Sequence, residues 1–421
     1  MIRRGEMALP IAQAQSDAAY PGRCNLAVCA GALFACRSIF VLVSDRWFNL
    51  GSESGTLAGF VLSVALVIAA MLTAIGKSYI PIAQLVKAQP VRWALLYLFF
   101  AGASLLWSAS VSPSTSAIYW GGLLGDIGIV LLLVRAYGAE RAAHALMRGF
   151  IIGACILAAI AWMMPVASDL RLGDLEYFNT NQIGNLCALA MLMCALLASR
   201  SQGRWRIATL FLGITLIRSL SKSTLIAYIA AQAYVLLRDK SMTRRRKWLL
   251  VATAAIVTVG FWGLLDTYVS NYATGNQAES LTGRTIIWAW ALDASLSKPW
   301  FGNGFDAMWK VAPPFGGELF EARHAENELL QQFFAYGVCG VALLIGVYGS
   351  LYRKARTLLS PERSALMAFL VFVIVRGFAE AEPFDLLLPL WLITTLALLM
   401  HAGPKQEPQS ASLPTPAVQV C

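Results

Sequence analysis

Charged residues are scarce in this chain, and their scarcity excludes most soluble protein classes. Only 13% of the 421 residues are Asp, Glu, Lys or Arg, whereas soluble proteins contain about 25%. Hydrophobic residues make up 58% of the chain, above the roughly 45–50% of soluble proteins. A soluble fold of this length could not bury so much apolar surface, so the composition predicts an all-α polytopic membrane protein.

The chain also has few histidines and no closely spaced pair of cysteines. None of the eight cysteines forms a CxxC pair, so neither a disulfide framework nor a zinc site is expected, and we predict no metal. The three histidines are His144, His324 and His401. The net charge of +10 does not indicate a nucleic-acid partner, because the basic residues lie in short clusters between apolar runs, as membrane topology produces.

Twelve apolar segments approach the length that a bilayer requires, which is about 20 mainly apolar residues for a helix. Only the polar run Arg218–Ser223 separates the seventh segment from the eighth. The predicted spans are 24–44, 55–76, 93–110, 117–137, 146–165, 181–199, 205–220, 223–238, 247–265, 328–350, 364–380 and 385–401.

Basic residues predict the orientation of these spans. With the N-terminus in the cytoplasm, 23 of the 33 Lys and Arg residues fall in cytoplasmic segments, as the positive-inside rule requires. Both termini are therefore expected in the cytoplasm. Residues 1–23 form the N-terminal segment, 24–265 hold spans one to nine, 266–327 form a large outer loop, 328–401 hold spans ten to twelve, and 402–421 form a tail whose Pro, Gln and Ser content predicts disorder.

Several basic residues lie on the predicted outer face, against the topology rule. Ionisable residues at membrane spans are costly and often functional. Together they would form a positive rim suited to an anionic, lipid-linked phosphate. These residues are Arg218, Lys222, Arg284, Arg323 and Arg376.

Structural roles for the same cations remain open. Arg376 can pair with Glu380 or Glu382 about one helical turn away. Arg218 and Lys222 are four residues apart and can reach lipid phosphates instead of a substrate.

The residues after Arg284 predict an amphipathic helix on the outer membrane surface, capped by Thr282 and ended by Lys298-Pro299. The sequence FGNGF at 301–305 follows. It is either a turn that returns the chain to the membrane or a cluster of backbone N–H donors, and a dinucleotide site is excluded because no strand precedes it. The apolar side of the helix is expected to contain Ile287, Trp288, Ala291, Leu292 and Leu296.

His324 is the one histidine predicted on the outer face, where Glu326 and Glu328 follow it. A lone histidine is more often structural than catalytic, but the neighbouring acids favour a general base here. On a regular helix His324 and Glu326 would point about 200° apart, so only one could face an acceptor. We favour His324 because an imidazole suits proton transfer near neutral pH, and Glu326 remains the alternative.

Three segments together resemble the O-antigen ligase and polymerase superfamily. They are GRTIIWAWALDASLSKPWFGNGFDAMW at 283–309, HAENELLQQFFAYGVCG at 324–340, and SLSKSTLIAY at 219–228. The detail PWFGNGFDAMW is most similar to the exopolysaccharide polymerase branch of the succinoglycan type. Members of the superfamily often have His-Asn nine residues before a Gly-x-x-Gly pair, whereas here Glu326-Asn327 occupies that place and His324 lies two residues earlier.

The resemblance implies a GT-C-like membrane glycosyltransferase of the bacterial inner membrane that needs no metal or other cofactor. It would transfer a glycan from undecaprenyl diphosphate to an acceptor hydroxyl on the periplasmic side, and it would work with a chain-length regulator and export proteins. Arg284 matches the arginine of the family's outer loop, and Lys222 matches its Ser-rich motif. Arg218 and Arg376 would add charge around the diphosphate, and His324 or Glu326 would act as base.

Two other functions remain open. An O-antigen ligase would use the same donor but transfer the glycan to lipid A-core. A lipid-linked oligosaccharide flippase or other transporter can also have twelve spans, but it is expected to bury ionisable residues near the bilayer midplane and to show repeated halves. Only Arg37 and Asp126 lie near a predicted midplane, and Arg37 has no evident partner in the sequence, so we interpret it as structural.

Overall fold

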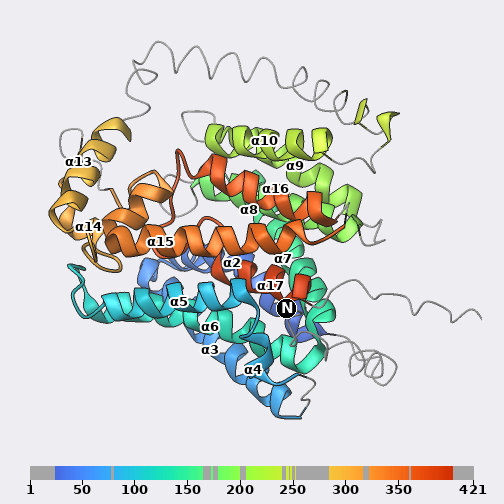
Figure 1. Ribbon diagram of the computed structural model, residues 1–421, viewed down its shortest axis with the longest axis horizontal. Helices are drawn as coiled ribbons and strands as arrows, with labels where there is room; N and C mark the ends of the chain where they lie inside the picture. Colours follow the sequence, from blue (N-terminus) through green and yellow to red (C-terminus); the bar gives the residue numbers. More distant parts are fainter. Residues whose placement is uncertain are drawn as a thin grey trace, which may run out of the picture.

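The computed structural model describes residues 24–76, 80–164, 172–173, 179–199, 205–238, 243–245, 247–248, 252, 284–315, 322–359 and 362–401 (Figure 1). Its elements are helices, as the composition predicted. In chain order they are α2 (Asn25–Arg46), α3 (Gly51–Gly76), α4 (Ile82–Leu85), α5 (Gln89–Ser104), α6 (Pro113–Tyr137), α7 (Ala139–Met163), α8 (Thr180–Ser199), α9 (Arg206–Ser219), α10 (Lys222–Arg238), α13 (Arg284–Ser297), α14 (Met308–Val311), α15 (Glu328–Arg356), α16 (Glu362–Arg376) and α17 (Leu390–His401).

Six of the described helices are long and apolar enough to cross a membrane: α2, α3, α6, α7, α8 and α15. The chain is therefore a polytopic membrane protein. Five further predicted spans are present as shorter helices of 12 to 17 residues, namely α5, α9, α10, α16 and α17. The span predicted at 247–265 lies almost wholly outside the described residues, as do most of the outer loop's first half and the C-terminal tail, so the count of twelve stays a prediction.

Helix α2 packs closely along α7. A Cβ atom added to Gly31 would lie 2.0 Å from the carbonyl oxygen of Leu146, and one added to Gly149 would lie 2.0 Å from that of Val28. Only glycine permits this approach, and small residues at such contacts are how helices associate in membranes.

Helix α15 runs across the middle of Figure 1, and it packs against α5, α13, α16 and α17. In Figure 1, α5 and α6 lie on one side of α15, and α8, α10 and α16 lie on the other. Helix α13 packs on the N-terminal part of α15, so the segment after Arg284 is held against the bundle. Ile287 and Ala291 of α13 are buried there, whereas Leu292 and Leu296 are exposed. One part of the predicted apolar side of α13 therefore packs against the protein, and the other part is exposed.

The FGNGF sequence at 301–305 forms a turn whose N–H groups bind other parts of the protein. Helix α15 is broken at Gly337, where φ is 63°, and this break leaves carbonyl groups without helical partners. Asn303 N donates to Phe334 O at 2.9 Å, and Gly304 N donates to Ala335 O at 2.8 Å. Because these N–H groups are occupied, the alternative of a backbone cluster for a ligand was wrong.

Arg37 has a partner, contrary to the sequence interpretation. Its guanidinium in α2 donates to Asp126 of α6, with Nη1 2.7 Å from Oδ2, and Nη2 contacts the second carboxylate oxygen. Asp126 is buried, so the pair joins two helices within the bundle. The sequence could not reveal this pair because the two residues are 89 positions apart.

Candidate functional site

Several helix ends meet around one buried carboxylate, that of Glu380, which follows α16. Glu380 Oε1 accepts three hydrogen bonds, each of 2.9 Å, from Asn181 Nδ2, Ser223 Oγ and Arg284 Nη2. Asn181 is the second residue of α8, Ser223 is the second of α10, and Arg284 is the first of α13. Glu380 is only 3% exposed, so this carboxylate fixes the starts of three helices relative to one another.

Arg376, the last residue of α16, lies on the other side of Glu380 and is 2% exposed. Its Nη2 is 3.9 Å from Glu380 Oε2, and its Nη1 is 3.7 Å from Glu382 Oε1. Its Nε donates to Thr224 Oγ1 of α10 at 3.3 Å. The pairing with both acids that the sequence offered as an alternative is therefore confirmed, and Arg376 joins α16 to α10.

Glu382 completes the acidic side of this cluster. Burial raises the pKa of the Glu382 carboxyl above its ordinary value, while the nearby Arg376 guanidinium and His324 act in the opposite direction. The Arg376 guanidinium, whose Nη1 is 3.7 Å from Glu382 Oε1, therefore partly offsets the effect of burial on this carboxyl.

Arg284 also contacts the loop that precedes α15. Its Nε donates to Glu326 Oε2 at 3.1 Å, and Glu326 Oε1 lies 3.8 Å from His324 Nδ1. The residues 322–327 are not helical, and Glu326 has a φ of 52°. His324 and Glu326 are therefore neighbours, and the prediction that they point in opposite directions was wrong because it assumed a regular helix.

The loop holds this conformation because α15 and the end of α16 both bind it. Asn327 caps α15, since its Oδ1 accepts from Leu330 N at 3.0 Å, and its Nδ2 donates to Phe378 O at 3.2 Å. Glu328 N donates to Gly377 O at 2.9 Å. The candidate base is thus positioned by the same turn, after α16, that carries Glu380.

Arg218 and Lys222 lie at the junction of α9 and α10, as predicted. Leu220 separates the two helices with a left-handed φ of 55°. Between the two cations, Ser221 Oγ donates to Asn181 Oδ1 at 2.8 Å, so the Ser-Lys-Ser segment reaches the Glu380 cluster. The Arg218 and Lys222 side chains are half-buried, and their role in binding a diphosphate stays a prediction.

Asn181, Ser223 and Thr224 were not predicted from the sequence, and Glu380 was considered only as a partner of Arg376. The segment FAEAEPF contained a usable signal, because two acids follow a basic residue at the end of an apolar span. Asn181 and Ser223 gave no comparable signal, since polar residues are common at helix starts. Among the described residues, no three His, Cys, Asp or Glu side chains are placed to hold a metal ion.

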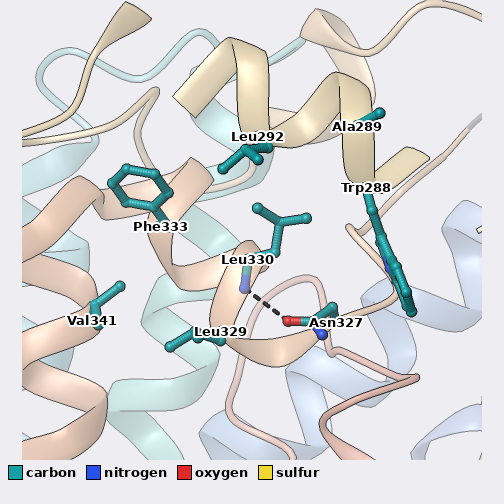
Figure 2. A pocket seen from close by; sticks show the side chains of 8 residues that line it. All are labelled: Trp288, Ala289, Leu292, Asn327, Leu329, Leu330, Phe333 and Val341. Carbon is teal, nitrogen blue, oxygen red and sulfur yellow. Dashed lines mark hydrogen bonds between the residues drawn. The ribbon is translucent and has the colours of Figure 1, made fainter. Parts of the chain in front are cut away.

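An apolar groove of about 410 Å³ lies beside the loop, between α13 and α15 (Figure 2). Figure 2 shows Trp288, Ala289 and Leu292 of α13 facing the first turns of α15. Trp288 Nε1 donates to Glu326 O at 3.3 Å, so one wall of the groove contacts the loop directly. The remaining lining residues are Asn327, Leu329, Leu330, Phe333 and Val341.

The fold and this cluster define a polytopic membrane protein with a site of arginines, acids and a histidine at its helix ends. Comparison with known proteins then finds a family model that is similar to its central segment. Residues 207–345 match the family model described as O-Antigen ligase, which confirms the predicted resemblance. This segment contains Arg218, Lys222, Arg284, His324 and Glu326.

A more extensive similarity links the chain to the exopolysaccharide production protein ExoQ of Rhizobium meliloti (strain 1021). The two are 24% identical over 328 residues, which cover 69% of this chain and 72% of that protein. The chain is therefore similar to a protein of exopolysaccharide production, and its residues 207–345 are similar to the O-Antigen ligase family model.

Proposed function

We propose that this protein polymerises undecaprenyl-diphosphate-linked repeat units of an exported polysaccharide on the periplasmic face of the bacterial inner membrane. The observation that carries the proposal is the position of Arg284 at the start of α13, where it lies between two carboxylates, one of which, that of Glu326, is 3.8 Å from His324 Nδ1. The similarity to an exopolysaccharide production protein favours a polymerase over other enzymes that use a lipid-linked glycan.

The reaction requires a cationic site for the leaving group. The acceptor sugar hydroxyl attacks the anomeric carbon of the donor, the bond from that carbon to the diphosphate oxygen breaks, and lipid diphosphate leaves. Arg284 can bind two diphosphate oxygens through its planar guanidinium. Helices α8, α10 and α13 all begin at this cluster, and the partial positive charge of helix N-termini favours the same anion. Lys222 and Arg218 are the further cations that we assign to diphosphate binding, and the buried Arg376 would act there only through its charge.

The reaction also requires a base, because the attacking hydroxyl must lose its proton as the new bond forms. His324 is our candidate, and Glu326 beside it is the group that would orient it. This mechanism uses side chains alone, so we propose that no metal or other cofactor takes part.

An O-antigen ligase is the second candidate, because the matching family model carries that description. It would use the same donor and base but lipid A-core as the acceptor. A flippase or other transporter is the third, and it would move the lipid-linked glycan without breaking a bond. A polymerase would in addition depend on a chain-length regulator and export proteins as partners.

These candidates differ in their products, so one reconstitution separates them. The protein is purified into nanodiscs and supplied with lipid-linked repeat units, a chelator, and lipid A-core in a parallel reaction. We expect a ladder of polymer on the lipid diphosphate and no dependence on lipid A-core. A single addition to lipid A-core would identify a ligase, and an unchanged glycan in both reactions would contradict the proposed enzyme.

A further inference from the structure

The two carboxylates that bind Arg284 are held very differently. Glu380 is 4% exposed in its side chain, accepts from Asn181 and Ser223 as well, and belongs to the turn after α16. Glu326 is 16% exposed in its side chain, lies in a loop, and accepts one hydrogen bond from Arg284. A ligand that competes for Arg284 can therefore replace Glu326 with less disturbance than Glu380.

A bound anion must displace a carboxylate from Arg284, because the guanidinium groups of this cluster are already paired with acids. The described cluster contains three carboxylates, of Glu326, Glu380 and Glu382, and the two guanidinium groups of Arg284 and Arg376. A diphosphate that approaches Arg284 therefore meets cations that are already paired with acids. It gains a bidentate contact only where an acid leaves.

The position of His324 gives the released carboxylate a second partner. In the present arrangement Glu326 N donates to His324 Nδ1 at 3.4 Å, and a neutral imidazole that accepts at Nδ1 carries its hydrogen on Nε2. Such an imidazole cannot take a proton at Nε2. Glu326 Oε1 is already 3.8 Å from Nδ1, so a small rotation of the carboxylate away from Arg284 brings it to this nitrogen.

We propose that Glu326 is a latch that couples donor binding to activation of the base, an inference that rests on the proposed function. Without donor, Glu326 neutralises Arg284, and Nε2 of His324 holds its hydrogen. When the diphosphate takes the place of Glu326 on Arg284, the carboxylate turns to His324 and accepts a hydrogen bond from Nδ1–H. The imidazole exchanges its Nε2 hydrogen with water and takes one up on Nδ1, which ends the hydrogen bond from Glu326 N, so that Nε2 can accept the proton of the acceptor hydroxyl.

This role of Glu326 predicts that one substitution tightens diphosphate binding and lowers turnover, which neither a purely structural nor a purely catalytic role predicts. In Glu326→Gln the side chain no longer competes as an anion for Arg284, so diphosphate should bind more tightly, while turnover should fall because the amide cannot stabilise the imidazolium. We expect about tenfold tighter binding, which corresponds to about 1.4 kcal/mol, together with at least a tenfold lower kcat. Glu326→Asp should recover part of kcat.

The experiment measures binding of farnesyl diphosphate to the purified full-length protein in nanodiscs, and separately the rate of polymer formation. The matched control is Asp293→Asn, which removes an exposed acid from the same helix as Arg284 and should change neither value. Weaker diphosphate binding in Glu326→Gln, or an unchanged kcat, would overturn the latch. If the wild-type protein bound no isoprenoid diphosphate, the proposed function itself would fail, and the two failures are thereby distinguished.

Discussion

Two groups of ion pairs in this protein differ in where they lie and in how many elements share them. Arg37 and Asp126 lie within α2 and α6, and both oxygens of one carboxylate contact one guanidinium. The Glu380 cluster lies at helix ends, and one oxygen of Glu380 accepts from three different helices. The first group joins two spans, whereas the second leaves several polar groups side by side with contacts that a ligand can exchange.

This difference explains why we assign function to one group and structure to the other. In the Arg37–Asp126 pair both oxygens of one buried carboxylate contact one guanidinium, so this carboxylate has little to offer a third partner. A cluster in which carboxylates compete for arginines next to a histidine can rearrange around an anion. The predictions below test this contrast, beginning with the largest expected effect on polymer formation.

Arg284→Ala should abolish polymer formation, with a loss of about 10³-fold, because the developing charge of the leaving diphosphate loses its principal donor. Arg284→Lys should recover little, since an ammonium group cannot form the bidentate contact. Activity is measured on lipid-linked repeat units, with membrane abundance checked by immunoblot. The control is Lys298→Ala, just beyond the opposite end of α13, and equal losses in both variants would contradict a specific role for Arg284.

His324→Ala should lower kcat by about 10²-fold, the effect expected when a general base is removed. His401→Ala, at the exposed end of α17, is the control. Near-normal activity in His324→Ala together with an inactive Glu326→Gln would make Glu326 the base.

Glu380→Gln should reduce polymer formation by about 10-fold, because Arg284 and the starts of α8 and α10 lose their common charged acceptor. The KM for the lipid-linked donor should rise with this variant, since Arg284 is no longer held in place. Glu382→Gln should have a smaller effect, because Glu382 contacts Arg376, whereas the hydrogen bonds from Asn181, Ser223 and Arg284 go to Glu380. A larger effect for Glu382 than for Glu380 would reverse their assigned importance.

The Arg37–Asp126 pair should affect stability and leave the chemistry almost unchanged. Asp126→Leu alone removes the carboxylate from Arg37, whose side chain is 36% exposed, and should lower the free energy of unfolding by about 1–3 kcal/mol. The double variant Arg37→Leu, Asp126→Leu should recover most of that loss. Thermal unfolding in detergent measures the stability, and a double variant that is stable but inactive would show that this pair also serves the reaction.

Much of the helical fold could be predicted from the sequence because apolar length and basic clusters are local signals. The division between α9 and α10, for example, followed from the short polar run that separates them, and α13 ends before Lys298-Pro299 as expected. The division of the α13 surface could not be predicted, because it depends on packing against α15. The break of α15 at Gly337 could not be predicted either, since the segment that satisfies its carbonyl groups lies some 30 residues earlier.

The candidate site was predictable in its charges and only partly in its geometry. Arg284, His324 and Glu326 were identified because each is polar in a segment predicted on the outer face. Glu380 could not be recognised as their common partner, because its contacts with Asn181 and Ser223 span 199 and 157 positions. The loop conformation of Glu326 was also beyond the sequence, since a positive φ in a non-glycine residue carries no composition signal.

The side of the membrane on which this cluster lies is the most direct test of the account. The donor and acceptor that we propose are present on the periplasmic face, so Arg284, His324 and Glu380 must face that side. Reporter fusions after Gly316 and after Thr243 measure the sidedness of the two segments in living cells. We predict a periplasmic reporter at Gly316 and a cytoplasmic reporter at Thr243. A cytoplasmic reporter at Gly316 would contradict the proposed reaction, because base and leaving-group site would face the wrong compartment.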